Sequence, residues 1–114
     1  MSQTSIRSRN IKDKQENTQI ISMNNLCAAD AALLREQVMK TLTKKTNRIY
    51  LDVQKVVECD LSGINEVIHS NYILQKASKN LVLVYQKKSV VEKWVKSTGL
   101  DQFMATAIIP ETSK

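Results

Sequence analysis

The sequence contains little glycine, proline, aromatic residue, cysteine or histidine. Its 114 residues include two Gly, one Pro, two Cys and one His, and aromatic residues make up 4% of the total. So little Gly and Pro excludes collagen-like and Pro-rich chains. The lone His69 is not part of any pattern with metal-ligand spacing. We therefore expect no metal site and no cofactor.

Long apolar runs are also absent. The longest run, residues 81–85, has five residues, whereas a membrane-spanning helix needs about 20. The first residues are polar where a signal peptide would have its apolar segment. These features predict a cytoplasmic location without membrane insertion, where Cys27 and Cys59 would be reduced thiols.

The remaining composition is typical of one globular domain. Hydrophobic residues make up 42% and charged residues 25% of the sequence, close to the averages for soluble proteins. The 17 Lys and Arg against 11 Asp and Glu give a net charge of +6. The basic residues are scattered along the chain and few aromatics accompany them, so nucleic-acid binding ranks behind a solvated basic surface or an acidic protein partner.

The hydrophobic pattern switches repeatedly between the strand period and the helix period. Strands are predicted at residues 4–10, 18–23, 48–53, 81–85 and 103–109. Helices are predicted at residues 28–43, 62–77 and 89–98. The strand at 48–53 is apolar almost throughout, which indicates burial on both faces. This β-β-α-β-α-β-α-β order predicts an α/β fold in which right-handed crossovers build a mixed sheet of four or five strands.

We expect residues 1–114 to form a single domain. Residues 1–17 are predicted to be either a ragged edge strand, whose charges discourage aggregation, or an arm, and residues 110–114 a tail. In the third helix, Ser89 and Glu92 have the spacing of a capping box, and Gly99 is predicted to end the helix in the left-handed conformation. Trp94 lies in the apolar stripe of that helix and is predicted to be largely buried.

In the second predicted helix, residues Ile64, Val67, Ile68 and Leu74 form the apolar stripe. Asn71 interrupts this stripe, and Ile73 falls on the opposite side. Asp60 and Ser62 stand just before the helix, where either side chain could accept hydrogen bonds from its first N–H groups. Gly63 is expected to let the chain turn or pack closely.

Three short motifs occur at the ends of predicted elements. Residues 49–52 read Ile-Tyr-Leu-Asp, residues 60–63 read Asp-Leu-Ser-Gly, and residues 97–100 read Ser-Thr-Gly-Leu. Together with the element order over residues 4–109, they resemble the STAS domain family, which includes anti-sigma-factor antagonists and cytoplasmic domains of sulfate transporters. Both glycines of the chain fall within these motifs.

The resemblance implies a STAS-like fold and a protein-binding regulatory module with no enzymatic activity. It would dock an anti-sigma factor or a related switch kinase through the loop at Asp60–Gly63 and the second helix. The alternative is an accessory STAS subunit of a transport ATPase complex of the lipid-transport type. A basic nucleic-acid-binding domain is the third possibility. The residues assigned to the partner surface are Asp60, Leu61, Ser62, Gly63, Glu66, His69 and Ile73.

The chain departs from the family pattern in several places, including Asn24-Asn25, where the family usually has a Gly, and the missing or reduced last helix; the departure that bears on regulation lies in the loop. In the antagonists the residue after the loop Asp is the Ser or Thr that the partner kinase phosphorylates, and here it is Leu61. Ser62 is the remaining candidate acceptor, one residue later. We therefore predict that phosphorylation at this loop does not regulate the protein in the usual way.

Two further polar residues near the motifs could carry chemistry. Asp52 has no His, Lys or second acid paired with it in the sequence, so we expect it to form hydrogen bonds at a strand end. Cys59 precedes Asp60, and a neighbouring negative charge raises the pKa of a thiol, which predicts an inert cysteine.

Overall fold

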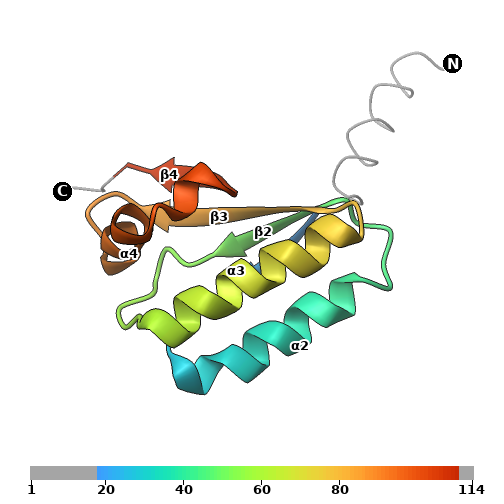
Figure 1. Cartoon of the computed structure of the whole chain (residues 1–114), viewed down its shortest axis with the longest axis horizontal. Helices are drawn as coiled ribbons and strands as arrows, with labels where there is room; N and C mark the ends of the chain where they lie inside the picture. The colour runs from blue at the N-terminus through green and yellow to red at the C-terminus, as the bar shows by residue number, and fades with distance from the viewer. Residues whose placement is uncertain (1–17, 111–114) are drawn as a thin grey trace, which may run out of the picture.

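The computed structural model describes residues 18–110, which form one β-sheet covered by helices (Figure 1). Its strands are β1 (Thr18–Ser22), β2 (Arg48–Asp52), β3 (Asn80–Gln86) and β4 (Ala105–Ile109). Its α-helices are α2 (Ala31–Thr41), α3 (Leu61–Lys76) and α4 (Val90–Thr98). Two short 3-10 helices, η1 (Ala28–Asp30) and η2 (Leu100–Gln102), precede α2 and β4. The edge strand or arm expected within residues 1–17, and residues 111–114 of the expected tail, lie outside the described residues.

Among residues 18–110 the sheet is parallel throughout, with strand order β1-β2-β3-β4. The α/β class and the positions of its strands and helices are as predicted. The prediction of a mixed sheet is not confirmed, because every strand pair in the described part is parallel. The strand predicted at residues 4–10 lies outside that part. The predicted helix at 28–43 divides into η1 and α2, where the Asp30 carboxylate accepts a hydrogen bond from the Cys27 N–H at 2.9 Å.

The helices cover one face of the sheet. Parallel crossovers are right-handed, and the strand order advances in one direction, so each crossover helix falls on the same side. Side chains of β2 and β3 that point to this side, such as Leu51, Leu83 and Tyr85, are completely buried. Figure 1 shows α2 and α3 side by side beneath the strands. This packing places the two ends of α3 at opposite ends of the sheet.

The other face of the sheet is only partly covered in the described structure. Arg48 is exposed, Tyr50 is half-buried, and Ile20 on β1 is 63% exposed. The prediction that residues 48–53 are buried on both faces is therefore wrong. The physical reason is the strand order, which puts α2, α3 and α4 together on the opposite side.

Helix α4 begins after Ser89 and ends at Gly99, as predicted, but Glu92 has a different partner from the one that a capping box requires. The Ser89 hydroxyl accepts from the Glu92 N–H at 3.3 Å, and Gly99 ends the helix with φ of 70°. The Glu92 carboxylate accepts from the Lys88 N–H at 2.7 Å rather than from the Ser89 N–H of a complete capping box. Trp94 is half-buried, less than predicted, because its indole lies at the edge of the core.

Candidate functional site: the start of helix α3

The segment before α3 is held against the segment that follows β1. The Leu26 N–H donates to the Glu58 carbonyl at 2.9 Å, and the Asp60 N–H donates to the Leu26 carbonyl at 3.1 Å. These two hydrogen bonds form a single parallel bridge between Leu26 and Cys59, beyond the ends of β1 and β2. The bridge extends the pairing of the two strands up to the first turn of the helix.

Asp60 joins the starts of two helices with one carboxylate. Its Oδ1 accepts from the Gly63 N–H at 3.0 Å, which caps α3, and its Oδ2 accepts from the Ala28 N–H at 3.2 Å, at the start of η1. Both bonds satisfy N–H groups that a helix leaves without partners. The cap that sequence analysis left open between Asp60 and Ser62 therefore belongs to Asp60.

Gly63 allows the close approach on which this arrangement depends. A Cβ atom at this position would lie 1.8 Å from the Leu26 carbonyl oxygen and 2.4 Å from its carbon. Both atoms are backbone, so no side-chain rotation could relieve the overlap. The expectation that Gly63 serves close packing is confirmed.

Trp94 holds the same loop from the other side. Its indole N–H donates to the Cys59 carbonyl at 3.1 Å, linking α4 to the residue just before Asp60. The loop is thus fixed by contacts from η1, from α4 and from the first turn of α3. Such a pre-organised loop can be recognised without the cost of ordering it.

Leu61 and Ser62 form the exposed first turn of α3. Leu61 is 55% exposed, and Ser62 is also exposed. In the described residues the Ser62 hydroxyl has no hydrogen-bond partner. The tip of the loop therefore presents an apolar side chain next to an accessible hydroxyl.

The outer face of α3 continues the surface that begins at Leu61. We define it by Leu61, Ile68, His69, Tyr72 and Lys76. Tyr72 is 58% exposed, His69 is exposed and Ile68 is half-buried. The Lys76 ammonium lies 5.2 Å from the centre of the Tyr72 ring, a cation–π contact that restrains both side chains. Leu61, Ile68 and Tyr72 lie at helical intervals of seven and four, so they follow one line along the helix.

Glu66 does not share this outer face, contrary to the prediction. It is buried, and its carboxylate accepts two hydrogen bonds from Arg35 of α2, at 2.8 Å from Nη2 and 3.3 Å from Nε. This pairing also raises the pKa of Arg35. Ile73, two turns after Glu66 on the same side, is half-buried rather than exposed. The prediction assumed that α3 buries only the side that faces the sheet. In the structure α3 also packs against α2, so the side that faces α2 is buried as well.

The two cysteines flank the loop and are poorly suited to nucleophilic chemistry. Burial, together with Cys27 and Asp60 nearby, raises the pKa of the Cys59 thiol to about 12. Partial burial and Asp60 also raise the pKa of the Cys27 thiol. A raised pKa keeps a thiol protonated at neutral pH, as expected for an inert Cys59.

Other chemistry-bearing residues lie away from the loop. The Asp52 carboxylate accepts from the Gln54 N–H at 3.0 Å, the strand-end role expected from the sequence. Within residues 18–110 no His, Cys, Asp and Glu side chains gather in a group that could hold a metal ion. In the same part of the chain, no helix has the length and apolar character to cross a membrane.

Sequence analysis missed two residues of this region, Arg35, which pairs with Glu66, and Tyr72, which is exposed on α3. It also missed the hydrogen bond that Trp94 donates to the loop. The contacts of Arg35 with Glu66 and of Trp94 with Cys59 join elements far apart in the sequence, so helical spacing within one element gave no signal for them. Tyr72 could have been found as an aromatic residue outside the apolar stripe.

Comparison of the chain with protein-family models, with curated proteins and with solved structures gives no match. The loop and the outer face of α3 are therefore the features of the described residues from which a function can be inferred.

The close approach at Gly63 predicts a severe effect of Gly63→Ala. The added methyl group must push the Leu26 carbonyl away, so we expect a loss of at least about 2 kcal/mol in the free energy of unfolding. Gly99→Ala is the matched control, because its Cβ meets nothing within 4 Å and only the left-handed φ of 70° opposes it; it should cost about 1–2 kcal/mol. Urea denaturation followed by circular dichroism measures both. An equal or larger loss for Gly99→Ala would contradict the role given to Gly63.

The raised pKa of Cys59 predicts slow alkylation. In a Cys27→Ser variant, the rate with iodoacetamide at pH 8 should be at least about 100-fold below that of a model thiol with a pKa of about 8.5. Because little thiolate is present, the rate should rise tenfold per pH unit up to pH ~10. Mass spectrometry of timed samples gives the rate, and the unfolded protein in urea is the control. A plateau near pH 8–9 would show that the thiol is not protected.

Proposed function

We propose that this protein is a STAS-like, non-enzymatic regulatory module that binds another protein through the 60–63 loop and the outer face of α3. The observation that carries the proposal is the exposure of Leu61 and Tyr72 on one line of a helix whose start is rigidly held. Exposed apolar side chains on a fixed helix face are typical of a helix-mediated protein contact.

The favoured partner is an anti-sigma factor or related switch kinase, as in the family that the motifs resemble. What supports this partner is that the loop lies directly at the start of α3, with Asp60 as the cap. Leu61 and Tyr72 would supply the buried anchors of the interface, since aromatic and large apolar residues dominate such contacts.

The exposed Leu61 also supports the second candidate, an accessory subunit of a transport ATPase complex. An apolar side chain at the tip of the loop is suited to a permanent contact. A reversible switch would instead need a hydroxyl at that position to accept phosphate. The identity of the bound partner separates these two candidates.

The docking surface can be tested with two charge substitutions. Leu61→Asp places a carboxylate in the first turn of α3, where the helix dipole favours it, and Tyr72→Glu keeps a good helix former. Each should weaken partner binding at least about tenfold, because each removes a central apolar contact. The partner is isolated from the source cell by affinity capture, identified by mass spectrometry and measured by biolayer interferometry.

The matched control is Leu33→Glu, which removes a similarly exposed apolar side chain, 49% exposed, from α2. It should leave the affinity within about twofold of the wild type. If Leu33→Glu abolishes binding while Leu61→Asp and Tyr72→Glu do not, the docking surface is not the outer face of α3. An identified kinase-like anti-sigma factor supports the first candidate, and a transport ATPase subunit supports the second.

The position of Leu61 predicts that the loop is not a phosphorylation switch. When the purified protein is incubated with the identified kinase and ATP, mass spectrometry should find no stoichiometric phosphate on Ser62. The physical reason is that Leu61, which has no hydroxyl, occupies the acceptor position, and Ser62 is displaced from it by one residue, about 100° around the helix. Stoichiometric phosphate on Ser62 that releases the partner would overturn this prediction.

A further inference from the structure

A cavity of about 520 Å³ opens at the amino ends of β2, β3 and β4, far from the loop at the start of α3. The two sites are separated by the length of α3, whose 16 residues span about 24 Å. The cavity falls within the usual size range of small-molecule sites. Its polar lining and its aromatic wall are formed by Arg48, Asn71, Gln75, Asn80, Gln102 and Phe103.

Asn71 is a polar side chain that α3 contributes to the cavity. It stands within the apolar stripe of α3, is 7% exposed and lines the cavity. Within residues 18–110 no group hydrogen-bonds to its carboxamide. The carboxamide is not among the fully enclosed side-chain groups that lack a partner in the described residues, so its polar atoms face the open space of the cavity. A ligand in the cavity would take the place of water as the hydrogen-bond partner of this carboxamide.

Three further carboxamide side chains line the cavity with Asn71. Gln75 follows Asn71 by one helical turn, Asn80 begins β3 and Gln102 ends η2. Each carboxamide offers both a donor and an acceptor. The lining contains no carboxylate, and Arg48 contributes a cation. Such a set recognises a ligand that carries hydrogen-bonding edges together with a negative charge.

The apolar wall fits a planar ring. Phe103 is 50% exposed and lines the cavity together with Met104 and Leu81. An aromatic side chain at the mouth of a carboxamide-lined cavity can stack on a heterocycle whose edge meets the amides. Asn and Gln side chains bind the edges of nucleobases in this way.

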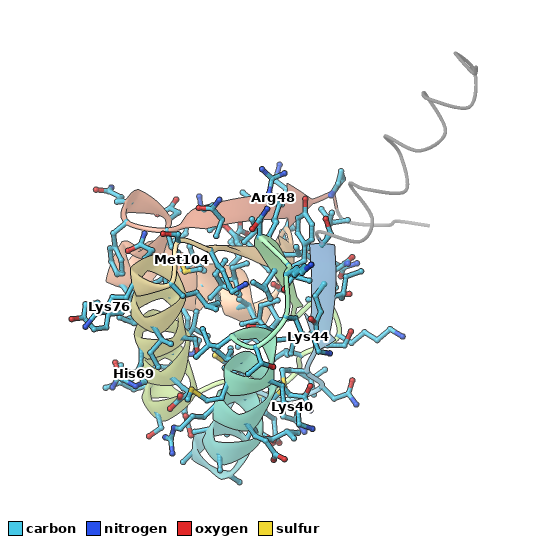
Figure 2. The ribbon with its side chains drawn as sticks, turned by 90° about the vertical axis from the view of Figure 1, so that its right-hand side faces the viewer. Lys40, Lys44, Arg48, His69, Lys76 and Met104 are labelled. Atoms are coloured by element: carbon cyan, nitrogen blue, oxygen red, sulfur yellow. The ribbon has the colours of Figure 1, made fainter. Side chains whose placement is uncertain are left out.

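The fold gathers basic residues around the same end. Lys44 and Lys45 precede β2, Lys76 ends α3 and all three are exposed. Lys79 is buried, and its ammonium donates to the carbonyls of Lys44 and Thr46, which fixes the turn that carries these lysines. Figure 2, which looks onto this end, shows Arg48 and Met104 near each other, with Lys44 and Lys76 to either side. Charges that are scattered in the sequence therefore lie around the same end of the sheet.

We propose that this cavity binds a nucleotide, with the base against the carboxamides and Phe103 and the phosphate on Arg48. The nucleotide is either free or one unit of a single-stranded nucleic acid, since both offer the same chemistry to the cavity. An acidic peptide would satisfy Arg48 and the lysines but would make no use of the four carboxamides or the exposed aromatic ring.

The test is a nuclear magnetic resonance titration of the ¹⁵N-labelled full chain. Its side-chain amide signals report directly on Asn71 and Gln75. The probes are AMP, GMP, CMP and UMP, single-stranded hexamers of RNA and DNA, inorganic phosphate and a hexaglutamate peptide. We expect at least one nucleotide or hexamer to shift the Asn71 side-chain signals with a Kd below about 1 mM. Saturation by a mononucleotide identifies free nucleotide as the ligand. Saturation by a hexamer alone, with a strong dependence on salt, identifies a strand.

Two variants of cavity residues and two control variants distinguish binding in the cavity from nonspecific attraction to a basic protein. Asn71→Leu should weaken nucleotide binding at least about tenfold, because it removes a carboxamide that faces the cavity. Arg48→Gln should weaken it several-fold. Asn65→Leu, at an exposed position of the same helix, and Lys93→Gln, on α4, should leave binding unchanged.

Several results would overturn the proposal. One is the absence of any shift at about 5 mM of every nucleotide and hexamer. A second is binding that Asn71→Leu leaves unchanged while circular dichroism shows the variant folded. A third is an equal effect of inorganic phosphate or hexaglutamate on the same signals, which would show that charge alone is recognised. If Asn71→Leu fails to fold, the isosteric Asn71→Asp replaces it, and unchanged binding by that variant would also count against the proposal.

Discussion

The contact between Gly63 and the Leu26 carbonyl holds the start of α3 against the segment that follows β1. Because a Cβ atom would lie 1.8 Å from that oxygen, only glycine permits the approach. The approach in turn lets one Asp60 carboxylate reach the first N–H groups of both η1 and α3. The exposure of Leu61 at the tip of a rigid loop, and with it the proposed docking surface, depends on this short distance.

The strand order gives the molecule two ends with different chemistry. Parallel strands that advance in one direction place the beginnings of the helices at the carboxyl end of the sheet and their last turns at the amino end. The docking loop with Asp60 lies at the first end. The carboxamide-lined cavity with Arg48 lies at the second, where the basic residues that follow α2 and end α3 also gather. A partner at one end and a ligand at the other would both contact α3, which connects the two sites.

Helix α3 shows how two packing partners decide which residues remain free for function. Its apolar residues face the sheet, and its Glu66 turns toward Arg35 of α2, where a buried carboxylate needs a cation. The exposed side that remains carries Leu61, His69 and Tyr72. Asn71 lies at the other border of the buried side, beside the cavity. A shift of phase by one residue would move all of these residues to different environments.

The sequence by itself determined the alternation of strands and helices and the left-handed stop at Gly99, because each depends on local periodicity or on backbone conformation. It singled out Gly63 for close packing, but the group that approaches Gly63, the Leu26 carbonyl, belongs to the segment after β1 and was identified only by the tertiary structure. It also marked Asn71 as an interruption of an apolar stripe. Only the tertiary structure decided that Glu66 is buried, that Asp60 rather than Ser62 is the cap, and that Arg48 lies near Asn71. The burial of Glu66 and the position of Arg48 arise from packing between elements far apart in the sequence, and the capping Asp60 also accepts a hydrogen bond from the distant Ala28 N–H. Helical spacing within one element carries no information about such neighbours.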